Sequence, residues 1–225
     1  MAKFAVVLDM DGLMVDSEPL SRRAWDQVLA RYDQTLDDTA YKGIIGHRTD
    51  ESAAILINAY SLPLSVNDLV CEKTNALVKI RAGGIPAMPG LYDFHARLVE
   101  HDLPWSVATS SPRAHAEEIL KQLGLAASCQ SIAGGDEVVQ GKPAPDIYLL
   151  AAERLGVQPR QCLALEDSAP GCHSAAAAGM MVVAIPNGDT KAADFSMADY
   201  VYPSLHEVAE KFDFLLAKLA GRQSV

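Results

Sequence analysis

Two aspartates, Asp9 and Asp11, directly follow an apolar run at residues 4–8. The run is short and uninterrupted, which predicts a buried strand, so both carboxylates would lie where the chain leaves the sheet. Ionised groups at the end of an apolar strand destabilise the fold unless something binds or neutralises them. Because ligands of open α/β sheets bind at this carboxyl edge, Asp9-Met10-Asp11-Gly12 is the first candidate for chemistry.

Three further polar motifs each follow a predicted strand: Thr109-Ser110, Lys142 and Glu166-Asp167. Taken singly, each motif has an ordinary interpretation as a surface turn, a helix cap or a solvated loop. The carboxyl ends of parallel strands share one edge of a sheet, however, so all of these side chains would meet there. Their order and their common place at strand ends therefore favour one shared site.

The predicted site would hold four carboxylates, of Asp9, Asp11, Glu166 and Asp167, against the single ammonium of Lys142. Crowding of this kind raises carboxyl pKa values unless a cation is present. Oxygen ligands without His or Cys favour a hard ion, and Mg²⁺ is the expected one. Hydroxyl groups, the lysine and the helix expected after Ser111-Pro112 would together suit a phosphoryl group.

Two aspartates beside a phosphoryl group also suggest a reaction. An ionised aspartate can attack phosphorus without a base and form an aspartyl-phosphate. A second aspartate can protonate the leaving alkoxide and later deprotonate the attacking water. Mg²⁺ and Lys142 would offset the charge on the transferring group.

The elements that must position these residues alternate along the chain. Strands are expected at residues 4–8, 105–108, 131–133, 162–165, 181–185 and 200–202. Amphipathic helices are expected at residues 91–101, 113–123, 146–155, 170–178 and 205–219. Strand and helix taking turns implies right-handed crossovers, so the predicted fold is α/β with a Rossmann-like parallel sheet.

A stretch between the first two strands carries helical patterns and no convincing strand. Helices are expected from Ser17, as N-cap, to about Tyr32, near residues 50–60 and at residues 66–80. The segment that follows, residues 82–90, is rich in Gly and Pro and indicates a linker. The predicted domains are a core of residues 1–15 and 89–225 and an inserted all-helical cap of residues 16–88, which would act as a lid.

Composition narrows the possible partners. A formal net charge of −10, with no cluster of Lys and Arg, argues against nucleic acid. Charges or prolines break every apolar run before the roughly 18–20 residues that a membrane span needs, and we expect no signal peptide. The four cysteines lack C-x-x-C spacing and are expected to be buried thiols: Cys71, Cys129, Cys162 and Cys172. We expect a cytoplasmic protein and a monomer, whose partner is a small phosphorylated metabolite.

The whole set of motifs resembles the haloacid dehalogenase superfamily of phosphotransferases, over essentially the whole chain. The matching segments are Asp9-Met10-Asp11-Gly12, Thr109-Ser110, Lys142 within residues 141–146, and Glu166-Asp167 within residues 165–168. Residues 11–19 and 171–179 are also typical of the β-phosphoglucomutase-like branch, whose helical cap follows the first strand. The resemblance thus implies a capped Rossmann-like phosphotransferase.

This resemblance implies a role for each motif. Asp9 would be the nucleophile and Asp11 the general acid and base; the presence of Asp11 argues against dehalogenation. Asp9, the backbone carbonyl of Asp11 and Asp167 would hold Mg²⁺ with Glu166 in support, while Thr109, Ser110 and Lys142 would hold phosphate. Substrate recognition would come from the cap, with His47, Arg48 and Lys73 as candidates.

The expected activity is Mg²⁺-dependent hydrolysis of a sugar or polyol phosphate. A β-phosphoglucomutase-type phosphomutase is the alternative, but Ser21 stands where the mutases carry a His, which favours hydrolysis. Phosphoglycolate, pseudouridine 5′-phosphate and nucleoside phosphates stay open as substrates. A regulator that binds a metabolite without catalysis is a different class, against which the intact set of motifs argues.

Overall fold

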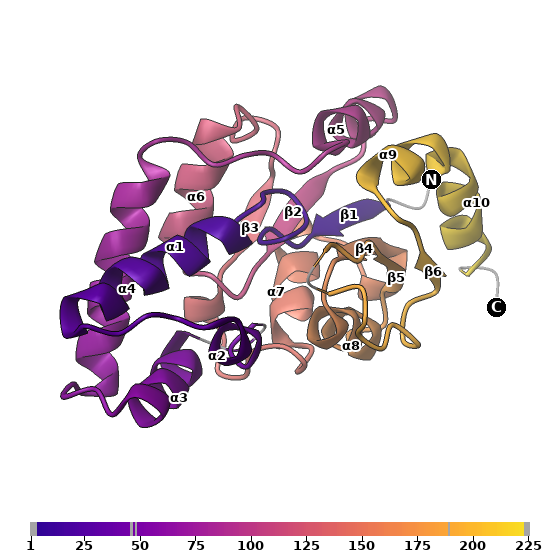
Figure 1. Ribbon diagram of the computed structural model, residues 1–225. Coiled ribbons are helices and arrows are strands. Elements are labelled where there is room, and N and C mark those ends of the chain that lie inside the picture. Colours follow the sequence, from indigo (N-terminus) through magenta and orange to yellow (C-terminus); the bar gives the residue numbers. More distant parts are fainter. Residues whose placement is uncertain (1–3, 46, 48, 189, 223–225) are drawn as a thin grey trace. The chain divides into compact units, whose positions relative to one another are not determined.

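The chain forms two compact units, Met1–Val15 with Ala87–Val225 and Asp16–Pro86. They are termed the core unit and the helical unit below. The computed structural model describes residues 4–222 except 46, 48 and 189 (Figure 1). None of the helices among these described residues is long and apolar enough to cross a membrane.

Within the described residues, the core unit contains one parallel sheet in the order β3-β2-β1-β4-β5-β6. Its strands are β1 (Ala5–Leu8), β2 (Trp105–Ala108), β3 (Ser131–Ala133), β4 (Cys162–Glu166), β5 (Met181–Ala184) and β6 (Tyr200–Val201). Leu8 at the end of β1 pairs in register with Val107 and Leu165. The three central strands therefore end side by side, and the predicted parallel α/β sheet is confirmed.

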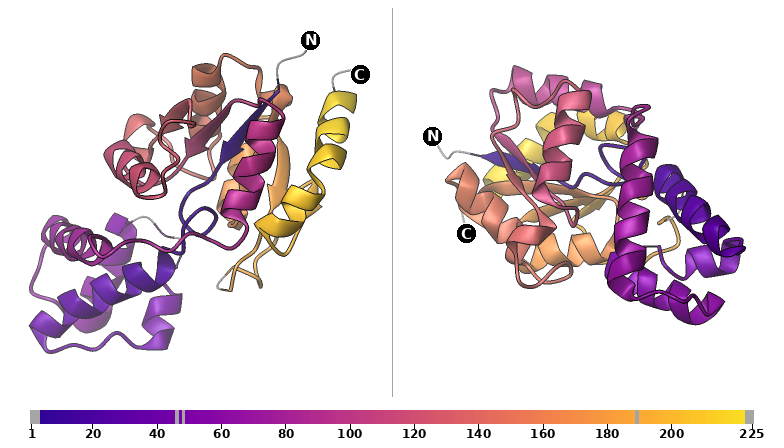
Figure 2. Two further views of the ribbon diagram at one scale, coloured as in Figure 1. Left: turned by 90° about the horizontal axis from the view of Figure 1, so that it is seen from above. Right: turned by 90° about the vertical axis from the view of Figure 1, so that its left-hand side faces the viewer.

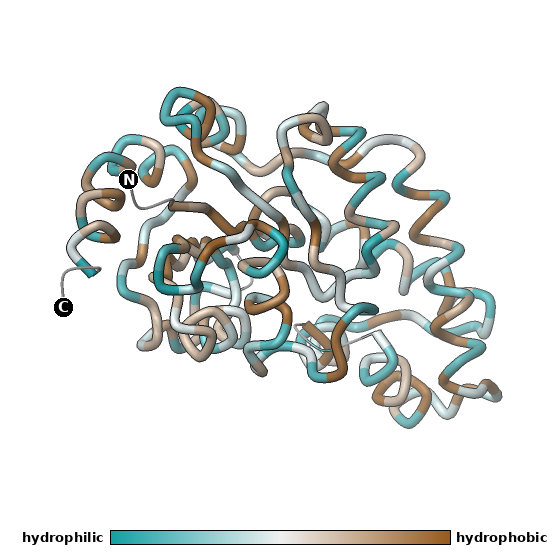
Figure 3. Tube along the Cα trace, turned by 180° about the vertical axis from the view of Figure 1, so that it is seen from behind, coloured by the Kyte–Doolittle hydropathy of each residue, from teal (hydrophilic) through white to brown (hydrophobic). Residues whose placement is uncertain are grey.

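Helices of the core unit cover both faces of this sheet. They are α5 (Leu91–Glu100), α6 (Arg113–Gln122), α7 (Asp146–Leu155), α8 (Ala169–Ala177), α9 (Leu205–Glu210) and α10 (Phe212–Gly221), with the 3-10 turns η2 (Gly135–Glu137) and η3 (Pro159–Gln161). Ala5 and Val7 pack with α7 and α8, while Val6 and Leu8, also buried, point to the opposite face. Figure 2 shows helices on both sides of the sheet, and Figure 3 shows the hydrophobic colouring of β1.

Two predicted element bounds in the core unit were wrong in ways that matter. Strand β4 extends to Glu166, so this carboxylate belongs to the strand rather than following it. The single helix expected at residues 205–219 is two helices that meet at Lys211, whose ψ of 6° breaks the helical path. The break lets Phe212 become fully buried and meet Phe94 edge to face, with ring centroids 5.3 Å apart.

The helical unit contains α1 (Glu18–Leu29), η1 (Ala30–Tyr32), α2 (Asp38–Lys42), α3 (Thr49–Tyr60) and α4 (Val66–Arg81). The apolar stripe of α1 is buried, and α1 packs mainly on α4. Ser17 was expected to cap α1, but its side chain makes no cap hydrogen bond because its backbone is already helical, with φ −87° and ψ −19°. Helix α2 was not expected; Asp37 caps it by accepting hydrogen bonds from the backbone of Thr39 and Ala40.

Candidate active site

The chain turns sharply after Asp9 at the end of β1. Asp9 N still donates to Leu165 O (3.0 Å), so Asp9 is held against the end of β4. Gly12 has φ +87°, and its N–H donates to Val15 O (2.9 Å), which closes the turn. A Cβ at residue 12 would lie 2.3 Å from Asp167 Oδ2, so only glycine leaves room for that carboxylate.

Lys142 reaches the sheet edge from the loop after β3 and links two carboxylates. Its Nζ donates to Asp9 Oδ1 and to Glu166 Oε1, each at 2.5 Å, and to Ala108 O at 3.1 Å. The three ammonium hydrogens thus have three acceptors. The side chains of Lys142 and Asp9 are only 7% and 8% exposed, so this contact is largely shielded from water.

Glu166 is fully buried, and both of its carboxylate oxygens accept hydrogen bonds. Besides Lys142, the Tyr148 hydroxyl donates to Oε1 (2.7 Å), while the Ser168 N–H and hydroxyl donate to Oε2 (3.2 and 2.9 Å). Gly171 provides the space, because a Cβ there would lie 1.8 Å from Oε1. The carboxylate is therefore fixed by the protein itself.

Asp9, Glu166 and Asp167 form a buried acidic cluster, in which one carboxylate oxygen of each lies within 4.8 Å of the others. Burial, reinforced by the charge of Glu166 and opposed by Lys142, raises the pKa of Asp9 to about 8. Burial and the charges of Asp9 and Glu166 raise the pKa of Asp167 well above its usual value. Three carboxylates facing one ammonium carry surplus negative charge, and this donor set fits a hard divalent cation such as Mg²⁺.

Burial alone would lower the pKa of Lys142. The charges of Asp9 and Glu166 outweigh burial, so the pKa of Lys142 is raised above its usual value. The lysine therefore stays charged and offsets part of the negative charge around it.

The carboxylate of Asp11 faces a different set of partners. Ser111 Oγ donates to Asp11 Oδ2 at 2.8 Å, and Thr109 Oγ1 lies 3.4 Å from the same oxygen. The group of carboxylates whose oxygens lie close together therefore comprises Asp9, Glu166 and Asp167, and does not include the Asp11 side chain. The two motif aspartates consequently have different surroundings, as two different chemical roles require.

The sheet edge also brings in side chains that the motifs did not indicate. Ser111, expected only to begin a helix, contacts Asp11; Tyr148 contacts Glu166; and Asn187, which follows β5, donates to Asp167 Oδ2 at 2.8 Å. Ser110, a predicted phosphate ligand, is exposed at the end of β2.

The helical unit contains a small polar hollow of about 80 Å³. Its lining includes Glu18, Ser21, Trp25, Tyr41, His47 and Lys73. Lys73 is only 8% exposed, and its Nζ lies 5.5 Å from the centroid of the Trp25 ring. His47, at 3.4 Å from Glu51, also lines the hollow, whereas the predicted Arg48 lies outside the described residues. Two of the three cap candidates therefore share one polar cavity.

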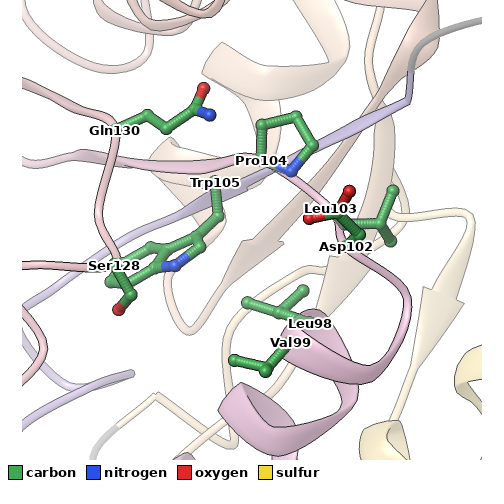
Figure 4. A pocket seen from close by; sticks show the side chains of 8 residues that line it. All are labelled: Leu98, Val99, Asp102, Leu103, Pro104, Trp105, Ser128 and Gln130. Atoms are coloured by element: carbon green, nitrogen blue, oxygen red, sulfur yellow. The ribbon is translucent and has the colours of Figure 1, made fainter.

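Another hollow, of about 360 Å³, lies in the core unit around the start of β2. Figure 4 shows residues that line it, including Trp105 and Pro104 with Ser128 and Gln130 nearby. Trp105 begins β2, whereas the acidic cluster lies at the carboxyl ends of the strands. This hollow is therefore separate from the chemistry of the motifs.

Comparison with known proteins agrees with this geometry. The family model described as haloacid dehalogenase-like hydrolase matches residues 5–179. Fructose-1-phosphate phosphatase YqaB of Escherichia coli is 37% identical over 79% of this chain and 94% of its own length. A probable pseudouridine-5′-phosphatase of Drosophila melanogaster is 34% identical over 88% of each chain.

A solved structure shares the fold as well. The crystal structure of CbbY from Rhodobacter sphaeroides in complex with phosphate superposes with a TM-score of 0.83 at 30% identity, covering 92% of this chain and 96% of the other. A buried acidic cluster at the carboxyl edge of a parallel sheet, the family match and these similarities lead to one conclusion. The chain belongs to the haloacid dehalogenase-like hydrolases, in the branch that contains phosphatases and β-phosphoglucomutase-like proteins.

Proposed function

We propose that this chain hydrolyses a small sugar or polyol phosphate through an aspartyl-phosphate on Asp9. The observation that carries the proposal is the different placement of the two motif aspartates. Asp9 lies in the buried cluster on Lys142, and Asp11 lies beside Ser111 and Thr109. One aspartate is thus suited to bonding with phosphorus and the other to moving a proton.

Mg²⁺ would be held by Asp9, Asp167 and the backbone carbonyl of Asp11. Both oxygens of Glu166 already accept hydrogen bonds from the protein, which favours a supporting role for Glu166. A bound Mg²⁺ supplies charge compensation for the phosphoryl group and for the anionic nucleophile. Its charge would also balance the negative charge of the acidic cluster, so that Asp9 and Asp167 need not be protonated.

The reaction of this chain's residues has two halves. A carboxylate oxygen of Asp9 attacks phosphorus, the bond between phosphorus and the leaving oxygen breaks, and Asp11 gives that oxygen its proton. Asp11 then takes a proton from a water molecule, whose oxygen attacks the aspartyl-phosphate and releases inorganic phosphate. Thr109, Ser110 and Lys142 hold the phosphoryl oxygens, and Lys142 keeps Asp9 in place between turnovers.

The polar hollow of the helical unit supports a hydroxyl-rich substrate. We assign recognition to Lys73 and His47, which line it, and to Arg48. The similarity to a fructose-1-phosphate phosphatase supports the sugar and polyol class, and the similarity to a probable pseudouridine-5′-phosphatase keeps that substrate in the test. Ser21 also lines the hollow and lacks the imidazole of the mutases, which favours water as the phosphoryl acceptor. A cytoplasmic monomer stays a prediction.

This function is tested by measuring the release of inorganic phosphate, with Mg²⁺ present, from a panel of phosphorylated sugars, polyols, glycolate and nucleosides. The wild type should release phosphate from a sugar or polyol phosphate, and Asp9→Asn should abolish turnover because it removes the nucleophile. Asp102→Asn is the matched control, since Asp102 lines the separate hollow and its φ of +48° suits asparagine. Interconversion of sugar phosphates without phosphate release would favour the phosphomutase, and turnover by Asp9→Asn at the wild-type rate would refute the proposal.

A further inference from the structure

We infer that Asn187 positions Asp167 for the cation and so sets the affinity of the site for Mg²⁺; this inference rests on the proposed function. Asn187 lies after β5, the strand next to β4, and Asp167 directly follows β4. It belongs to none of the sequence motifs described above. Its role would be to position Asp167, without touching the substrate itself.

The amide of Asn187 bridges two groups of the site. Nδ2 donates to Asp167 Oδ2 at 2.8 Å and to Gly12 O at 3.2 Å. Gly12, Asp167 and Asn187 follow β1, β4 and β5 respectively, so one NH₂ group joins the ends of three strands. A Cβ on Gly12 would lie 2.8 Å from Nδ2, so this contact also depends on the glycine.

The direction of the amide is itself fixed by Thr190. Asn187 Oδ1 accepts hydrogen bonds from Thr190 N and from Thr190 Oγ1, both at 3.3 Å. With its oxygen directed at these donors, the amide must present its NH₂ group to Asp167. Asp167 is only 5% exposed, so its carboxylate has little water to orient it. The protein thus orients Asp167 in two steps: Thr190 orients the amide of Asn187, and this amide orients the carboxylate of Asp167.

Partners that orient a metal-binding side chain typically change metal affinity by about 10- to 100-fold when they are removed. The competing interpretation is that Asn187 only stabilises its loop, since Asn187 N donates to Thr190 Oγ1 (3.0 Å) and Asn187 O accepts from Lys191 N (3.1 Å). Those two contacts use backbone atoms of Asn187. The side chain of Asn187 also bonds to Thr190 of the same loop through Oδ1, so side-chain variants change both kinds of contact. Metal affinity and unfolding in EDTA, measured on the same variants, separate the two interpretations.

Mg²⁺ binding to the full chain should be measured by calorimetry without substrate. Thermal unfolding in EDTA and turnover over a range of Mg²⁺ concentrations should be measured on the same variants. Asn187→Ala and Asn187→Leu, which keeps the branched shape of the side chain without its hydrogen-bonding atoms, should each raise the Kd about 10-fold or more. Thr190→Val, which removes one of two donors to Oδ1, should raise it less. Asn58→Ala, on the exposed face of α3, should leave it unchanged. Excess Mg²⁺ should restore most of the turnover of the Asn187 variants.

A wild-type Kd in both Asn187 variants would overturn the inference while leaving the proposed function intact. Turnover that excess Mg²⁺ does not restore, together with a lower unfolding temperature in EDTA, would also overturn it and favour the loop role. A wild-type chain that neither binds nor needs Mg²⁺ would remove the proposed function and this inference together.

Discussion

Among single residues, Tyr148 has a buried hydroxyl that supports the acidic cluster and has no part in the proposed reaction. The hydroxyl donates to Glu166 Oε1, and the ring lies beside Lys142, with Nζ 5.2 Å from its centroid. Tyr148→Phe keeps the ring and removes the donor. We expect it to lower the free energy of unfolding by about 1–3 kcal/mol, because a buried carboxylate loses a partner.

Urea unfolding at fixed pH measures this effect, and phosphate release should fall because Glu166 helps to hold Lys142. Tyr92→Phe is the matched control. The Tyr92 hydroxyl donates to Leu123 O at 3.3 Å, but the residue is 53% exposed. Equal losses of stability in the two variants would contradict the special position of the Tyr148 hydroxyl.

The sequence was sufficient to predict which polar side chains meet at the strand ends but not how each side chain is oriented there. Asp9, Lys142, Glu166 and Asp167 meet because parallel strands end at one edge, which the order of the motifs implies. The contact of Asp11 with Ser111 depends on side-chain orientation in the turn, which residue types do not encode. Tyr148 occupies an ordinary apolar position in its helix, so its hydroxyl gave no separate signal.

Among the elements, the loop between β3 and α7 carries Lys142. An ion pair near the start of this loop holds the loop against α7. Arg154 donates through both terminal nitrogens to the Glu137 carboxylate, at 2.8 Å each. Glu137 Oε2 also accepts from Gly134 N at 2.9 Å. Hydrogen bonding from Arg154, aided by Gly134, lowers the pKa of Glu137 from 4.5 to about 2.

This lowered pKa gives the ion pair a defined pH dependence. A carboxyl group whose pKa is lower in the folded state stabilises the fold above its unfolded pKa, and the effect is lost as the pH falls from about 4.5 towards about 2. Glu137→Gln should therefore lower the free energy of unfolding by about 1 kcal/mol at pH 7. The difference from wild type should shrink as the pH falls below about 4.5.

Urea unfolding at pH 7, 5 and 3.5 follows this difference directly. Glu118→Gln, an exposed carboxyl on α6, serves as the control and should show little change at any of these values. A difference for Glu137→Gln that stays constant down to pH 3.5, or that is absent at pH 7, would show that the pair does not anchor the loop as an ion pair.

Long periodic elements were predicted well, and their interruptions were not. The apolar spacing of residues 205–219 fits one helix, but a turn at Lys211 brings Phe212 into the core, and tertiary packing decides that turn. The short helix α2 has too few residues for a periodic signal; a cap at Asp37 marks its start. Ser17 has a residue type that favours capping, yet the backbone that follows β1 is already helical there.

In the whole molecule, two stretches of chain connect the core unit to the helical unit. Asp16 N donates to Pro86 O and Met88 N donates to Met14 O, each at 2.9 Å, and Val15 pairs with Ala87. The helical unit is therefore inserted where two points of the core backbone already lie together. The sequence indicated such an insertion from the change of periodicity and the segment of glycines and prolines, although the division falls at Pro86 and Ala87.

The stability of the whole chain should depend on Mg²⁺ if the acidic cluster is its site. Ligand binding at 100 times the Kd stabilises a folded protein by about 2.7 kcal/mol, which for a chain of this size raises the unfolding temperature by about 5–10 °C. Asp167→Asn should be at least as stable as wild type in EDTA, because it removes one of three buried, mutually repelling carboxylates, and should gain little from Mg²⁺. Both effects are measured by thermal unfolding in EDTA and in saturating Mg²⁺. Asp102→Asn is the control and should keep the full rise in unfolding temperature that Mg²⁺ causes. Equal stabilisation of Asp167→Asn and wild type by Mg²⁺ would place the cation elsewhere and contradict the assignment of the cluster.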